Sequence, residues 1–158
     1  MHSIIQANLT NPLHAQAEIT LLDAYAQDPM GGGSGLSESV KRDLCAQLIQ
    51  RNAVVVLAFH DDKPVGLINA FEGFSTFQCK PLLNIHDVAV LPDYRGQGIA
   101  SAMLRKVEEI ARQRGCCKLT LEVLEGNAPA RAAYEKFGFR GYELDPAAGK
   151  ALFLEKTL

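Results

Sequence analysis

The feature that most constrains the fold is a strand, a glycine pair and a long helix that follow one another in the middle of the chain. Residues 82–91 are mostly apolar, Pro92 ends the run, and the sequence Gly-Gln-Gly comes shortly after. Over residues 96–114, apolar side chains recur at steps of three and four, and Gly115 is the glycine expected just beyond a helix end. The segment therefore predicts a buried strand, a tight turn and an amphipathic helix.

The rest of the chain alternates between strand and helix patterns around that unit. Strands are expected over residues 3–10, 53–59, 65–71, 82–91, 118–124, 139–144 and 150–156. Helices are expected over residues 12–27, 37–51, 96–114 and 127–138, with a mobile glycine-rich loop over residues 31–35. This order, β-αα-βββ-α-β-α-ββ, predicts one α/β domain over residues 1–158, with a mixed, mostly antiparallel sheet and helices on both faces.

Composition and charge exclude several classes of protein. The 158 residues suit one ordinary domain, and a net charge of −2 argues against a nucleic-acid binder, which needs a surplus of lysine and arginine. No apolar run approaches the roughly 18 residues of a membrane span, and the N-terminus shows no secretory pattern. We therefore expect a cytoplasmic protein with reduced cysteines, no membrane partner and no metal site.

Charge is divided unevenly along the chain. Residues 1–79 carry eight acidic and four basic side chains, whereas residues 80–158 carry ten acidic and twelve basic ones. Differences of this size can arise by chance. The alternative is functional: the first half of the chain binds a cation and the second half binds an anion.

The glycine turn is suited to binding a diphosphate. Gly96 and Gly98 would let the backbone approach an anion, the first amides of the helix would point at it, and Arg95 would add positive charge. The pattern is no dinucleotide fingerprint, because Ser101 stands where a third glycine would be, and it is no P-loop, because no Gly-Lys-Ser/Thr follows.

The sequence Arg-Gly-Gln-Gly-Ile-Ala at residues 95–100 resembles the acyl-CoA pyrophosphate loop of the GNAT superfamily of N-acetyltransferases. Downstream, residues 127–139 are similar to the second hallmark of that family. The resemblance implies acetyl-CoA as co-substrate, with the pyrophosphate on the turn amides and the pantetheine arm along the preceding strand. The residues implied in cofactor binding are Val88, Ala89, Val90, Arg95, Gly96, Gln97, Gly98, Ile99, Ala100 and Asn127.

The resemblance also implies the catalytic groups. An N–H near Ala89 or Val90 would stabilise the oxyanion, and Tyr134 would protonate the departing thiolate as general acid. Tyr134 is otherwise a packing aromatic on its short helix.

The general base is less directly indicated. Relatives often carry a Glu where Asn84 stands, so His86 is the first candidate, with a hydrogen-bonded structural histidine as its alternative. In a regular strand His86 shares a face with Asn84 while Asp87 points the other way, and a bulge would change this parity. Glu72 is a second candidate for the base.

The resulting hypothesis is an N-acetyltransferase that transfers an acetyl group from acetyl-CoA to a primary amine of a small molecule by direct attack on the thioester. The acidic first half favours a cationic acceptor. Two alternatives stay open: a protein or peptide N-acetyltransferase, and a non-catalytic acyl-CoA-binding sensor. The resemblance also implies a homodimer, in which the final strands would pair between two copies.

Overall fold

The computed structural model describes residues 1–142 and 144–158. Its contacts divide the chain into two compact units, residues 1–124 and residues 125–158, which are described separately below.

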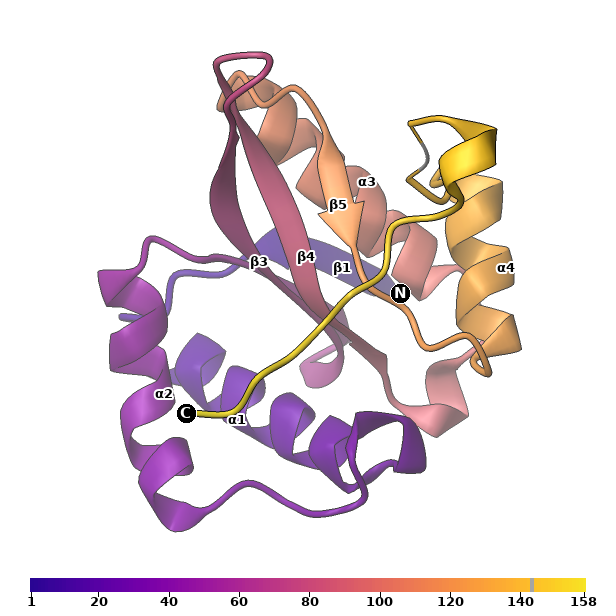
Figure 1. Ribbon diagram of the computed structural model, residues 1–158. Coiled ribbons are helices and arrows are strands. Elements are labelled where there is room, and N and C mark those ends of the chain that lie inside the picture. Colours follow the sequence, from indigo (N-terminus) through magenta and orange to yellow (C-terminus); the bar gives the residue numbers. More distant parts are fainter. Residues whose placement is uncertain (143) are drawn as a thin grey trace. The chain divides into compact units, whose positions relative to one another are not determined.

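The first unit is built on a five-stranded sheet (Figure 1). Its strands are β1 (His2–Gln6), β2 (Val54–His60), β3 (Lys63–Ser75), β4 (Lys80–Val90) and β5 (Leu119–Leu121), and they lie in sequence order. β1 to β4 pair antiparallel, whereas β5 runs parallel to β4. The prediction of a mixed, mostly antiparallel sheet is therefore confirmed.

Helices cover both faces of this sheet, as predicted (Figure 1). They are α1 (Pro12–Gln27), α2 (Glu38–Gln50) and α3 (Ile99–Gln113). Leu67 of β3 packs in one cluster with Leu21 of α1 and Leu48 of α2. The preceding residue of the strand, Gly66, lies against Met103 of α3 instead, so close that a Cβ atom at this position would require movement of the Met103 side chain. Because alternate residues of a strand face opposite ways, α1 and α2 lie on one face and α3 on the other.

Side chains cap the starts of two helices, and the glycine predicted beyond the end of the third lies there. The side chain of Asn11 accepts a hydrogen bond from the Leu13 amide at the start of α1, and that of Ser37 accepts one from the Val40 amide at the start of α2. Gly115 follows α3 with a φ of 72°, a left-handed conformation that favours glycine.

The second unit contains α4 (Ala128–Phe137), which Asn127 caps and Gly138 ends. The strands expected over residues 139–144 and 150–156 are corrected here, because the described residues of these segments form no strand; Glu143 lies outside the described residues. A backbone hydrogen bond from Ala151 to the Tyr142 carbonyl joins the two segments. An isolated pair of strands is marginal in water, and the exposed side chains of residues 152–154 show no alternation between buried and exposed.

Candidate active site

The predicted anion-binding turn lies at the N-terminus of α3. Gly96 and Gly98 have φ angles of 75° and 78°, and a Cβ atom at either position would meet nothing within 4 Å. The first backbone hydrogen bond of the helix runs from the Ala102 amide to the Gly98 carbonyl, so the amides of the preceding three residues have no helical acceptor. Open space, free amides and the positive end of the helix dipole together fit a diphosphate.

Arg95 is tied to the rest of the first unit. Its Nε donates to the Val90 carbonyl at 3.0 Å, and its Nη2 lies 3.1 Å from Oδ2 of Asp28, just after α1. Asp28 also accepts from the Met30 amide, and these two contacts lower the pKa of its carboxyl below the usual value. The backbone amide of Arg95 donates to the Pro92 carbonyl. The predicted contact of Arg95 with a pyrophosphate stays a prediction.

Gln97 is also held by neighbours through its side chain. Its Oε1 lies 3.2 Å from Nε2 of His2, and its Nε2 donates to the Asp93 carbonyl at 3.3 Å. Both contacts use the Gln97 side chain, and neither involves its backbone amide.

The outer edge of β4 opens beside this turn. β5 pairs only with residues 83–85 of β4, so residues 87–90 have no strand partner on that side within the part of the chain that the structure describes. The Leu91 amide donates to the Val65 carbonyl of β3, and because hydrogen-bonding residues alternate, Val88 and Val90 direct their N–H and C=O groups away from β3. Ala89 directs its own groups toward β3. Val88 and Val90 thus offer the strand edge expected for a pantetheine arm, with the Val90 carbonyl bonded to Arg95.

A β-bulge changes the faces of the residues before this edge. Asn69 of β3 lies opposite Asp87, whereas the next residue, Ala70, lies opposite Ile85, so His86 is the extra residue of β4. Asp87 therefore lies on the α1 face with Asn69, and the bulge changes the parity that a regular strand would have here.

His86 and Asn84 occupy different environments. The His86 side chain is 66% exposed, its Nδ1 lies 3.4 Å from Oδ1 of Asp87, and its ring meets the ring of Phe71 edge-on. Asn84 donates to the Thr120 hydroxyl at 2.9 Å and so connects β4 to β5. His86 is free to meet an acceptor, whereas Asn84 has a structural contact.

Glu72, the second candidate for the base, is engaged elsewhere. Its Oε1 lies 3.4 Å from Nη1 of Arg114, at the end of α3. Glu72 follows Phe71 along β3 and so faces the opposite side of the sheet from Asn69.

Sequence reasoning missed two buried polar residues on the α1 face. Asn69 donates through Nδ2 to Oε1 of Glu18 at 2.8 Å and to Oδ2 of Asp87 at 3.2 Å. Glu18 and Asn69 are 0% and 1% exposed. Burial, together with the charge of Asp87, raises the pKa of Glu18 to about 7 against the opposing effect of the Asn69 hydrogen bond. The available signal was a carboxylate on the apolar stripe of α1 and an amide within an apolar strand.

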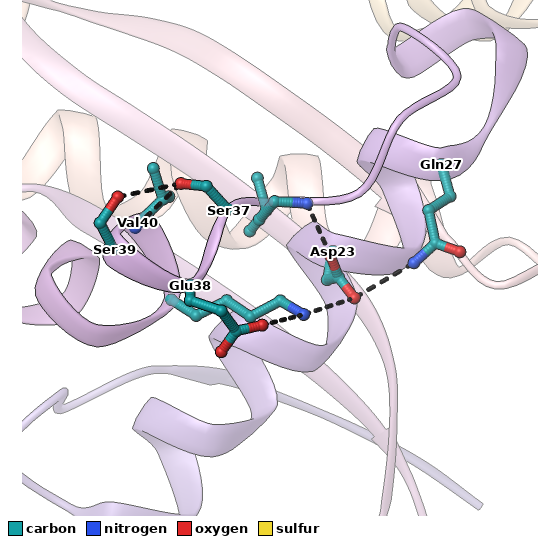
Figure 2. Close-up of polar contacts among 8 residues, drawn as sticks. Asp23, Gln27, Ser37, Glu38, Ser39 and Val40 are labelled. Carbon is teal, nitrogen blue, oxygen red and sulfur yellow. Dashed lines mark hydrogen bonds and ion pairs between the residues drawn. The ribbon is translucent and has the colours of Figure 1, made fainter.

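The glycine-rich segment between α1 and α2 is anchored at both ends. Asp28 holds its beginning, and Asp23 holds its end by accepting from the Leu36 amide at 2.8 Å, beside Lys41 at 3.5 Å (Figure 2). The Leu36 hydrogen bond is the main cause that lowers the pKa of Asp23. Gln27 also donates to this carboxylate, as Figure 2 shows. The segment therefore has defined end points near the face that carries Asp87.

Asn127 and Tyr134 belong to the second unit. Oδ1 of Asn127 accepts from the Ala130 amide at 3.3 Å, and the ring of Tyr134 packs edge-on against Phe139, with centroids 6.0 Å apart. Their predicted roles toward the cofactor stay predictions.

Within residues 1–142 and 144–158, no group of three or more His, Cys, Asp or Glu side chains is arranged to hold a metal ion. In the same residues, no helix combines the length and apolarity needed to cross a membrane.

Comparison with known proteins extends the match beyond the turn. The model of the Acetyltransferase (GNAT) family matches residues 20–139. Streptothricin acetyltransferase of Streptomyces lavendulae is 45% identical over 65 residues, which are 41% of this chain and 34% of that protein. Thialysine N-epsilon-acetyltransferase of Bos taurus is 44% identical over 54 residues, which are 34% of this chain and 32% of that protein. The matched part is thus about a third of the length of these curated relatives.

A solved structure shares the fold over the whole chain. The structure of AAC(6')-Iy in complex with the bisubstrate analog CoA-S-monomethyl-acetylneamine has a TM-score of 0.78, with 18% identity over 100% of this chain and 99% of that one.

Proposed function

This chain belongs to the GNAT acetyltransferase family, and from that premise we propose that it is an acetyl-CoA-dependent N-acetyltransferase acting on a primary amine of a small molecule. The observation that carries the proposal is the unpaired edge of β4 running directly into the glycine turn at the start of α3. The family fold binds acetyl-CoA as co-substrate.

The donor is proposed to lie along this edge and turn. The amides at the start of α3 would receive the pyrophosphate, and the outward-facing groups of Val88 and Val90 would pair with the pantetheine arm as an added strand does. Of the two candidates for the oxyanion donor, Val90 is favoured, because its N–H faces the open edge while that of Ala89 faces β3.

The acceptor is proposed to enter over the α1 face, where Asp87 and His86 reach the surface. A primary amine is mostly protonated at neutral pH, and the carboxylate of Asp87 would attract it. His86 would then take the proton, directly or through water, and leave a neutral nucleophile. The small-molecule class is supported by relatives that are named for streptothricin and thialysine.

The reaction is a direct acyl transfer. The amine nitrogen forms a bond to the thioester carbonyl carbon, the carbon–sulfur bond breaks, and the electron pair leaves with sulfur. Once His86 has released the first proton to water, it accepts the amine's second proton, and we propose Tyr134 as the group that protonates the thiolate. The products are an amide and free coenzyme A.

The test is to incubate the protein with acetyl-CoA and a panel of small amines and short peptides, and to follow free thiol and the mass of the acceptor. We expect thiol release that requires an amine and a matching acetylated product. Acetylation of peptides but of no small amine would support the protein-acetyltransferase alternative. Tight binding of acetyl-CoA without turnover of any acceptor would support the sensor alternative.

A further inference from the structure

Three hydrogen-bonded polar side chains form a row that connects α1 to two strands of the sheet. The row begins with Glu18 on α1, continues with Asn69 on β3 and ends with Asp87 on β4. Glu18 and Asn69 are buried, whereas the Asp87 side chain is 20% exposed. The row therefore connects the core of the first unit to the surface that we assign to the acceptor.

This row of side chains has more hydrogen-bond acceptors than donors when both carboxyl groups are ionised. The Asn69 nitrogen gives one hydrogen to each carboxyl group, which leaves Oε2 of Glu18 and Oδ1 of Asn69 buried with no hydrogen-bond partner among residues 1–142 and 144–158. Both atoms only accept when Glu18 is ionised, and a buried unsatisfied acceptor costs free energy. If Glu18 carried a proton on Oε2, that atom would become a hydrogen-bond donor. Oδ1 of Asn69, which belongs to the amide already bonded to Glu18, is an acceptor that has no other partner among the described residues.

The groups around the row supply no compensating cation. Cys45 of α2 donates through its thiol to the Ala15 carbonyl, and burial together with the Glu18 charge raises the pKa of that thiol. For Tyr25 of α1, burial together with the charges of Asp87 and Asp28 raises the pKa of the hydroxyl. From β4, His86 lies beside Asp87. From β2, the neighbours in the core cluster are apolar.

No lysine or arginine among the described residues forms an ion pair with either carboxyl of the row. Two ionised carboxylates on one neutral amide would repel each other in a site of low dielectric constant. The stable arrangement carries a single negative charge, and that charge belongs on Asp87, the only partly exposed one of the two carboxyl groups.

We propose that Glu18 is a positioning residue, a buried neutral carboxylic acid that acts through Asn69 to hold Asp87 as the one carboxylate that receives a cationic acceptor amine. The proposal rests on the proposed function and deepens it, since it assigns the charge class of the acceptor. Asn69 orients one oxygen of Asp87, and the other lies toward His86, so the amine would meet a carboxylate of fixed orientation beside the base.

One experiment observes the proton directly and needs no turnover. The carbonyl stretch of a protonated carboxylic acid is recorded by infrared spectroscopy for the wild type, Glu18→Gln and the control Glu38→Gln, which removes an exposed carboxylate on α2. At about pH 6 we expect a band in the wild type and the control that is missing in Glu18→Gln, and that fades in the wild type toward about pH 9. Identical spectra for all three proteins at about pH 6 would overturn the proposal.

A second experiment tests the action on Asp87. We expect Glu18→Leu to raise the KM of the amine about tenfold with an unchanged KM for acetyl-CoA, and Glu18→Gln to restore most of the loss. The carboxamide can accept from the Asn69 nitrogen and donate to its oxygen, as the neutral acid does, whereas leucine can do neither. If Glu18 served only to fill the core, leucine would be the better replacement, and that order would overturn the proposal.

The variant Asp87→Asn provides an independent measurement of the KM for the amine in case Glu18→Leu does not fold. It keeps the shape of the side chain and removes the charge, so we expect a KM for the amine raised about tenfold or more, again with an unchanged KM for acetyl-CoA. Failure of the proposed function would appear as no amine-dependent thiol release by the wild type and would overturn both proposals. If the wild type turns over and the KM for the amine is the same in the wild type and in these variants, only the proposal about Glu18 is overturned.

Discussion

The guanidinium of Arg95 lies 3.1 Å from the carboxylate of Asp28, and this ion pair joins the turn before α3 to the segment after α1. The two residues are 67 positions apart in the sequence. One end of the pair belongs to the turn that we assign to the donor, and the other begins the glycine-rich segment on the acceptor side. The contact therefore links the two halves of the proposed site.

This pair leads to a prediction about coenzyme A affinity. Asp28→Asn removes a negative charge near the turn and releases Arg95 toward the pyrophosphate, so we expect the Kd for coenzyme A to fall about two- to fivefold at low salt and less at high salt. Isothermal titration calorimetry measures this, with Asp61→Asn as a control on the exposed turn after β2. Weaker binding by Asp28→Asn would instead mean that the ion pair preorganises the turn.

The open space at Gly98 gives a matched pair of variants. Gly98→Glu and Gly115→Glu both place a side chain on a left-handed backbone, at the two ends of α3, where no atom lies within 4 Å of the new Cβ. We expect both to lower the free energy of unfolding by about 1–2 kcal/mol. Only Gly98→Glu should lose affinity for coenzyme A, by about 100-fold or more, because it places bulk and negative charge where the pyrophosphate would bind. Equal affinities of the two variants would remove the turn from its assigned role.

Tyr134→Phe tests the general acid. It keeps the ring that packs on Phe139 and removes the hydroxyl, so we expect kcat to fall about 100-fold with little change in the KM for acetyl-CoA. Thiol release under saturating acetyl-CoA measures the effect. Tyr142→Phe, in the same unit, is the control that should keep its activity. A fully active Tyr134→Phe would make this tyrosine a packing residue.

His86→Ala tests the base through its pH dependence. Imidazole accepts a proton only while it is neutral, so we expect the loss of kcat/KM to be largest, about 100-fold, at about pH 8 and small at about pH 5.5. The control His14→Ala removes an imidazole of α1 that accepts a hydrogen bond from the Asn8 amide. A loss of the same size at every pH would assign His86 a structural role.

The buried Glu18 makes folding stability depend on pH. Its pKa is raised from 4.5 to about 7 in the folded protein, so the native state binds the proton more tightly than the unfolded chain. The resulting stabilisation is full below about pH 4.5 and is lost as the pH rises through about 7, a change of about 3 kcal/mol.

Urea denaturation at about pH 5 and pH 8 measures this change. We expect Glu18→Gln to lack that part of the pH dependence and to be more stable than the wild type at about pH 8. Glu38→Gln should keep the wild-type pH dependence, because its carboxylate is exposed. If the free energy of unfolding had the same pH dependence in the wild type and in Glu18→Gln, the raised pKa of Glu18 would be contradicted.

Much of the first unit follows from local patterns. The apolar runs of β2 and β3, the periodicity of α3 and the cap at Ser37 each lie within a few neighbouring residues. The prediction of two final strands was wrong, because the local sequence indicates only that a segment can form a strand. Whether it does depends on a neighbouring strand to pair with.

The sequence by itself determined the order of elements in the first unit, the faces of α3 and the glycine turn, because periodicity and backbone preference are properties of short segments. Only the tertiary structure decided that Asp87 shares a face with Asn69, since strand pairing made His86 the extra residue of a bulge. It also brought Glu18 to that pair across 51 positions of sequence. Contacts of this kind depend on register and burial, which are set by the packing of distant segments and leave no local signal beyond a polar residue in an apolar run.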